Sequence, residues 1–163
     1  MRTAGLILAF GLLTTAPVLP RGSATPPACK LLTAQEASKM MGGMALVVNP
    51  DDAARSDFSC RYNPDPNAYT GVEINYRSFA SRQAAHSYFP RWVIPVPPAP
   101  ADMGIHPAPG VGDTAVIVSG KIAKSIYFQH GAVLVKMGTS PPGVATDDAL
   151  VVAAKAMLGR MGA

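Results

Sequence analysis

Apolar and polar residues alternate along residues 70–79, and this period of two predicts a β-strand with one buried face and one wet face. The buried face would carry Val72, Ile74 and Tyr76, and the wet face Glu73, Asn75 and Arg77. Apolar stretches bounded by turn-forming residues predict five further strands, at residues 44–48, 58–63, 114–118, 122–128 and 132–138. Because short turns join most of these strands, we expect antiparallel pairing.

Helical spacing of apolar residues predicts three helices, at residues 34–41, 82–88 and 147–161. The first begins with a capping box, in which the Thr33 hydroxyl and the Glu36 carboxylate satisfy free backbone N–H groups. The second should end near Tyr88, because Pro90 disfavours helical backbone at Phe89.

The order of these elements indicates an α+β fold, an antiparallel sheet of about five to six strands with helices packed on one face. We expect both β regions to share one sheet, and residues 25–163 to form a single α+β domain. Residues 49–57 read as a polar loop. The proline-dense segment 90–109 is either a stiff crossover between the two halves or a functional loop.

The N-terminal residues 1–24 have the layout of a secretory signal peptide. Arg2 precedes a short apolar run, and Gly22 and Ala24 are the small residues expected before a cleavage site. We therefore predict cleavage between Ala24 and Thr25, with a retained anchor or a cytosolic chain as alternatives. The strongly apolar part is shorter than the roughly 20 residues that cross a bilayer, so no stable membrane span is expected after cleavage.

Two cysteines, Cys29 and Cys60, allow several interpretations. In an exported chain they would pair as a disulfide, and the alternatives are two buried free thiols or a lipid attached at Cys29. The residues before Cys29 are two prolines and an alanine, which do not resemble the tripeptide of a lipoprotein signal. A disulfide would tie the first helix to an early strand, in a periplasmic or secreted protein.

Charge gives little indication of a partner. The formal net charge of +4 falls to about +2 once Arg2 and Arg21 are removed with the signal. The remaining lysines and arginines are scattered singly, which argues against nucleic acid or an anionic membrane surface as the partner.

Candidate catalytic residues are sparse. The three histidines, His86, His106 and His130, stand apart in the sequence and read as exposed single side chains. No nucleophile elbow is present, and the "GVGD" at 110–113 lacks the residues of a phosphate-binding loop and reads as a turn before a strand. We therefore expect no enzyme activity, no cofactor and no metal site.

Aromatic residues gather at one place, just before and within the proline-dense segment. We take five residues there as a candidate binding surface: Tyr88, Phe89, Trp92, Ile94 and Val96. Rigid aromatic groups beside prolines lose little entropy on binding. The alternative is that these side chains pack as core beneath the crossover.

Several motifs occur in an order that resembles a family. They are "CKLLTAQEASKMMGG" from Cys29, "CRY" from Cys60, "GVGDTAV" from Gly110 and a C-terminal helix. The chain is similar, from about Cys29 to Met161, to small exported domains of unknown function common in actinobacterial lipoproteins. The resemblance implies that Cys29 and Cys60 form a disulfide, and it implies no catalytic activity.

From these observations we expect a non-catalytic exported domain that binds a cell-envelope or extracellular partner, protein or ligand. One alternative is a small hydrophobic-ligand carrier, with a pocket between sheet and helices lined by residues such as Tyr76, Phe128 and Met157. Another is a secreted enzyme inhibitor that uses the proline-dense segment as a wedge.

Overall fold

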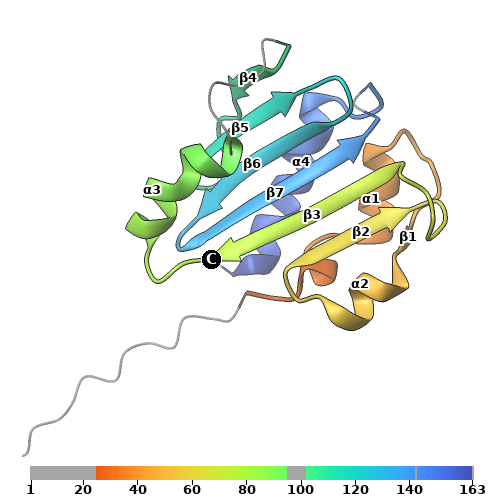
Figure 1. Cartoon of the computed structure of the whole chain (residues 1–163), viewed down its shortest axis with the longest axis horizontal. Helices are drawn as coiled ribbons and strands as arrows, with labels where there is room; N and C mark the ends of the chain where they lie inside the picture. The colour runs from red at the N-terminus through yellow and green to blue at the C-terminus, as the bar shows by residue number, and fades with distance from the viewer. Residues whose placement is uncertain (1–24, 95–101, 142, 163) are drawn as a thin grey trace, which may run out of the picture.

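The computed structural model of the chain describes residues 25–94, 102–141 and 143–162 (Figure 1). The helical elements are the 3-10 helix η1 (Ala28–Lys30) and four α-helices, α1 (Ala34–Met40), α2 (Pro50–Arg55), α3 (Arg82–Val93) and α4 (Asp147–Met161). The strands are β1 (Val47–Val48), β2 (Ser59–Asn63), β3 (Gly71–Ser78), β4 (Gly104–Pro107), β5 (Thr114–Ser119), β6 (Lys124–His130) and β7 (Val133–Ser140).

All seven strands form one antiparallel sheet in the order β1-β2-β3-β7-β6-β5-β4. The prediction that both β regions share one sheet is confirmed, and they meet where β3 pairs with β7, from Gly71↔Ser140 to Ser78↔Val133. The α+β class and the antiparallel pairing are also as predicted. The sheet has one strand more than expected, because β4 forms within the proline-dense segment.

One face of the sheet packs against α1, η1 and α4, which lie behind the strands in Figure 1. Side chains at every second position of the central strands point into this main core, among them Val72, Ile74 and Tyr76 of β3. The wet and buried sides predicted for residues 70–79 are therefore assigned correctly.

The prediction that the helices cover one face is wrong, because α3 packs on the opposite face, in front of the sheet in Figure 1. Ala85, Phe89 and Val93 of α3 pack with Val118 and Leu134 in a second core cluster. Strands β5 to β7 are apolar on both sides over part of their length, and such strands need cover on both faces. We call the face that carries α3 the outer face.

Two local expectations also fail. The helix α3 continues through Pro90 to Val93, where the predicted helix stopped near Tyr88. Burial of Phe89 and Val93 against the sheet outweighs the hydrogen bond that a proline inside a helix removes. Part of the predicted loop 49–57 is helix α2, which starts with Pro50 at its first position and with the Asn49 side chain accepting from Asp51 N.

The N-terminal elements are tied to the sheet by the predicted disulfide. Cys29 of η1 is bonded to Cys60 of β2, and their Cα atoms are 5.0 Å apart. The capping box of α1 is present as predicted, with Glu36 N donating to Thr33 Oγ1 at 3.2 Å and Thr33 N donating to the Glu36 carboxylate at 2.8 Å. None of the helices in the described ranges is long and apolar enough to cross a membrane.

Candidate functional site

The helix α3 covers only part of the outer face, and the remaining part carries polar side chains in two rows. Each row is fixed by the strand register, which places residues of neighbouring strands directly opposite each other. The first row runs Asn75, Lys136, Tyr127 across β3, β7 and β6. The second row runs Arg61, Glu73, Gly138, Ser125 across β2, β3, β7 and β6.

A pocket of about 410 Å³ lies where the first row meets α3. We call it the α3 pocket, and its lining consists of Asn75, Tyr88, Arg91, Trp92, Tyr127 and Lys136. Three of these side chains come from successive turns of α3, and the other three come from three different strands. A volume of this size falls in the range of small-molecule sites.

Two cations in the α3 pocket have no counter-ion. Neither Arg91 nor Lys136 has a carboxylate within ion-pair distance among the described residues, whereas five other cations there are paired: Arg61, Arg82, Lys121, Lys124 and Arg160. Arg77 lies beside the pocket, with its Nη1 donating to Tyr88 Oη at 3.2 Å and its guanidinium 4.9 Å from the centre of that ring. This end of the outer face is therefore positively charged.

Hydrogen-bond donors in the α3 pocket also exceed acceptors. The Nε1 atom of Trp92 is buried and has no hydrogen-bond partner within the described ranges. Burial raises the pKa of Tyr127, and the charge of Glu73 adds to the effect, so this phenol stays protonated at neutral pH. The chemistry of the pocket consequently favours a ligand that accepts hydrogen bonds or carries negative charge.

A second, smaller hollow of about 190 Å³ adjoins the α3 pocket, and Lys136 lines both. We call it the glycine hollow, because Gly71 and Gly138 leave its floor without side chains. A Cβ atom at Gly138 would lie 2.7 Å from Ser125 Oγ. Around this floor stand Arg61, Asn63, Ala68, Tyr69, Val72, Glu73, Ala123, Ser125, Lys136 and Ser140.

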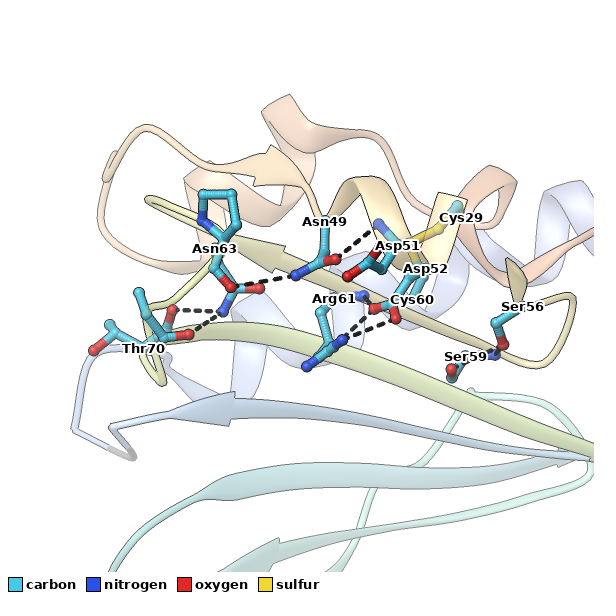
Figure 2. A network of polar contacts seen from close by, with 12 residues as sticks. Cys29, Asn49, Asp51, Asp52, Ser56, Ser59, Cys60, Arg61, Asn63 and Thr70 are labelled. Carbon is cyan, nitrogen blue, oxygen red and sulfur yellow. Dashed lines mark hydrogen bonds and ion pairs between the residues drawn. A yellow bond between two sulfur atoms is a disulfide. The ribbon is translucent and has the colours of Figure 1, made fainter. Parts of the chain in front are cut away.

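One wall of the glycine hollow is held by a polar network that Figure 2 shows. Arg61 donates from Nε and Nη2 to the two oxygens of Asp52, at 2.8 and 3.0 Å, and Asp52 raises the pKa of this guanidinium. Asn63 Nδ2 donates to the carbonyl oxygens of Ala68 and Thr70, at 2.8 and 3.1 Å. These bonds fix the loop that presents Tyr69, whose surface is 98% exposed.

The structure places the five residues of the predicted binding surface in different surroundings. Tyr88 and Trp92 line the α3 pocket, whereas Phe89 is 8% exposed and packs beneath it in the second core cluster. Ile94 is half-buried against the same cluster, and Val96 lies outside the described residues.

Four residues of the α3 pocket were missed by sequence analysis: Asn75, Arg91, Tyr127 and Lys136. Asn75 and Arg91 had a signal, since the alternation placed Asn75 on the wet face of residues 70–79 and Arg91 directly precedes Trp92. Tyr127 and Lys136 could not be linked to Trp92, because they approach it only through the register of β3, β7 and β6 and the position of α3.

Other candidate groups have structural partners. His106 Nε2 and Lys124 Nζ both contact Asp147, at 2.8 and 2.9 Å, and these bonds lower the pKa of that carboxyl, with Lys124 as the larger cause. His86 contacts Gln129, and His130 contacts the carbonyl oxygen of Gly162. In the part of the chain that the structure describes, no three side chains of the metal-binding types are grouped to hold an ion.

The three residues named for a hydrophobic-ligand carrier are core residues. Tyr76 is 6% exposed, and Phe128 and Met157 are fully buried in the main cluster. A pocket lined by them would require the core to open, so the structure offers no support for a carrier at that place.

The chain was also compared with known proteins. No family model matches it, and no curated protein matches it. The resemblance to exported actinobacterial domains therefore stays a prediction.

Proposed function

We propose that this chain is a non-catalytic exported domain that binds a cell-envelope or extracellular partner through the uncovered part of its outer sheet face. The contact surface would comprise the α3 pocket and the glycine hollow, which share Lys136. Both would remain accessible in the folded protein without any rearrangement of the core.

A single observation carries this proposal, namely that Arg91 and Lys136 stand without counter-ions beside Tyr88 and Trp92 in one pocket. Desolvated aromatic and arginine side chains in a pocket are the groups that contribute most to binding energy. Unpaired cations on a surface also steer ligands of opposite charge toward it.

Two further features support export. Residues 1–24 have the sequence layout of a secretory signal, and the Cys29–Cys60 disulfide is compatible with an oxidising compartment. A disulfide that fixes the first helical elements also suits a small domain working outside the cell, because it limits unfolding there.

The proposal is tested by capturing partners from the native envelope. The full chain, tagged at its C-terminus, is recovered from the extracytoplasmic fraction of its own host and incubated with solubilised envelope material. We expect the wild type to retain material that the double variant Arg91→Glu/Lys136→Glu does not.

The matched control is the double variant Lys30→Glu/Lys155→Glu, which changes the charge equally but on the opposite side of the molecule, on η1 and α4. Both of these lysines are exposed and have no ion pair among the described residues. Equal retention by the two double variants would refute the proposed surface, and a tagged chain found only in the cytoplasm would refute export.

A further inference from the structure

We infer that the ligand of this face is an acidic saccharide, a short glycan whose sugar units carry carboxylate or phosphate groups. The inference rests on the proposed function, because it names the chemistry of the partner that the same face would bind.

Charge supports the acidic part of this inference. Arg77, Arg91 and Lys136 surround the α3 pocket without an ion pair in the described ranges, and Glu73 is the one acid that lines the two hollows. The charge of Arg61 is already balanced by Asp52. An anionic group would therefore be held at the α3 pocket, where charge-assisted hydrogen bonds from Arg91 and Lys136 are available.

The aromatic side chains support a ring-shaped ligand. Tyr88, Trp92 and Tyr127 line the α3 pocket, and each combines an apolar ring with a polar atom at its edge. A sugar ring has the matching character, with C–H groups on its faces and oxygens at its rim. The buried Nε1 of Trp92 would gain an acceptor if a small shift of the indole brought it to a ligand oxygen.

The glycine hollow supports a hydroxyl-rich ligand rather than a peptide. Among the described residues, no hydrogen bond joins Ser125 Oγ or the Glu73 carboxylate to another group, and both can pair with a hydroxyl group. Gly138 makes room for the Ser125 hydroxyl, which would lie 2.7 Å from a Cβ atom at that position, and so helps to place this hydroxyl at the floor of the hollow. No large apolar side chain stands in the wall as an anchor for peptide side chains, since Tyr69, with its edge hydroxyl, is the one large ring there.

The two hollows together suit a short oligomer. Side chains on one face of a strand repeat every two residues, about 6.8 Å apart. The row of Lys136 and the row of Gly71 and Ser140 are four residues apart on β7, which places them about 14 Å apart. A ligand spanning this distance would place its acidic group at the α3 pocket and neutral hydroxyls at the glycine hollow.

Substitution of Glu73 distinguishes binding of an acidic saccharide from general attraction of anions to a positively charged surface. If the face only attracted anions, Glu73→Ala would strengthen binding by removing a negative charge. If Glu73 accepts hydrogen bonds from sugar hydroxyls, the same substitution weakens binding although the face becomes more positive.

The test is titration of the full-length, oxidised protein with four defined probes, followed by isothermal calorimetry and amide NMR shifts. The probes are tetragalacturonate, mannotetraose carrying a terminal 6-phosphate, neutral maltotetraose and hexaglutamate. We expect at least one of the two acidic saccharides to bind about tenfold or more tightly than maltotetraose and hexaglutamate. The tighter of the two identifies carboxylate or phosphate as the recognised group.

Variants then locate the site. Lys136→Gln, which keeps the size of the side chain, and Glu73→Ala should each weaken binding of the acidic saccharide about tenfold, whereas Lys155→Gln should leave it unchanged. Hexaglutamate binding as tightly as the saccharides, stronger binding by Glu73→Ala, or no saccharide binding at all would each overturn the inference.

The two proposals can fail separately. If envelope material is retained through Arg91 and Lys136 but no acidic saccharide binds, the inference about the ligand is wrong and the binding function stands. If no envelope material is retained through this face, the proposed function is wrong. Unchanged circular dichroism of every variant is required before either result is interpreted.

Discussion

The carboxylate of Asp113 accepts a hydrogen bond from the backbone N–H of Gly131 at 2.8 Å, and so joins the start of β5 to the turn between β6 and β7. Its other oxygen accepts from Arg82 Nη2 at the first position of α3, also at 2.8 Å. The backbone reinforces this link, since Asp113 N donates to the carbonyl oxygen of Gln129 at 2.8 Å. One aspartate therefore holds together three segments that position α3 on the outer face.

This arrangement explains the "GVGD" motif as a structural device. Gly112 has a φ of 55°, and a Cβ atom at this position would collide with the carbonyl oxygen of Gln129. Glycine is thus required twice over, by the left-handed backbone and by the close approach of β6. The prediction that the motif is a turn before a strand is confirmed, and the link to α3 is new.

We predict that Asp113→Ala lowers the free energy of unfolding by about 1–3 kcal/mol, because a backbone N–H and a guanidinium lose a charged acceptor. Urea denaturation followed by circular dichroism measures the change. Asp102→Ala is the control, since Asp102 pairs with Lys121, whose side chain is 81% exposed, and should change stability by less than about 0.5 kcal/mol. Equal losses in the two variants would contradict the role given to Asp113.

The sequence predicts most elements of this fold because local rules decide them. The alternation of residues 70–79, the capping box at Thr33 and the helical spacing of residues 147–161 all match the structure. The side of the sheet on which α3 packs is not a local property. The run "TAVIV" from Thr114 predicts only a strand, and although it is apolar at successive positions, periodicity does not say which helix covers its second face.

The strand β4 escaped prediction for a related reason. Its residues 104–107 follow a dense run of prolines, and Pro107 cannot donate a hydrogen bond to a neighbouring strand. As the last strand in the sheet order, β4 has one strand partner, β5, and an edge tolerates a residue without an N–H. The candidate site was hidden in the same way, because α3, β3, β6 and β7 meet only after the sheet has formed.

The helix α3 contains Pro90, and its substitution tests whether packing of the helix on the sheet offsets the low helix propensity of proline. Pro90 has no N–H to donate to the carbonyl oxygen of His86, although Ile94 N still donates to Pro90 O at 2.9 Å. We predict that Pro90→Ala restores the missing bond and raises the free energy of unfolding by about 1–3 kcal/mol. Pro66→Ala, in the turn after β2, should instead lower the free energy of unfolding slightly. Without this proline the unfolded chain has more conformational entropy, which it loses on folding.

Thermal and urea denaturation of the two proline variants measure this difference. A lower stability of Pro90→Ala than of the wild type would contradict the prediction. It would mean that the constraint Pro90 places on the unfolded chain outweighs the hydrogen bond that the folded helix gains.

The disulfide should contribute strongly to stability because it closes a long loop. Cys29 and Cys60 are 31 residues apart, and the chain-entropy model gives a stabilisation of about 3–4 kcal/mol for a loop of this length. We predict that Cys29→Ala/Cys60→Ala lowers the free energy of unfolding by that amount. Addition of a reductant should destabilise the wild type and leave the double variant unchanged.

Thiol titration of the denatured, unreduced protein provides an independent check. We expect no reactive thiol, because the structure pairs both cysteines and contains no other. Two reactive thiols in protein recovered from its native compartment would contradict the pairing and weaken the argument for export.

The last prediction concerns acid stability and the ion pair between α1 and α4. Arg160 Nη2 donates to Glu36 Oε1 at 2.8 Å, and this bond, together with those from Thr33, lowers the pKa of Glu36 from 4.5 to about 2 against the opposing effect of burial. The unfolded chain therefore binds a proton at Glu36 at a higher pH than the folded protein does. The stabilisation is fully present above pH 4.5 and is lost as the pH falls toward 2.

Because 28% of the Glu36 side chain and 34% of the Arg160 side chain are exposed, we expect the pair to contribute about 1–2 kcal/mol at neutral pH. Glu36→Gln keeps the size of the side chain but cannot ionise. The variant should be less stable than the wild type at pH 7, and the difference should shrink between pH 4.5 and pH 2. Urea unfolding at a series of pH values measures it, and a difference that stays constant down to pH 2 would show that the ionised pair is not what stabilises this contact.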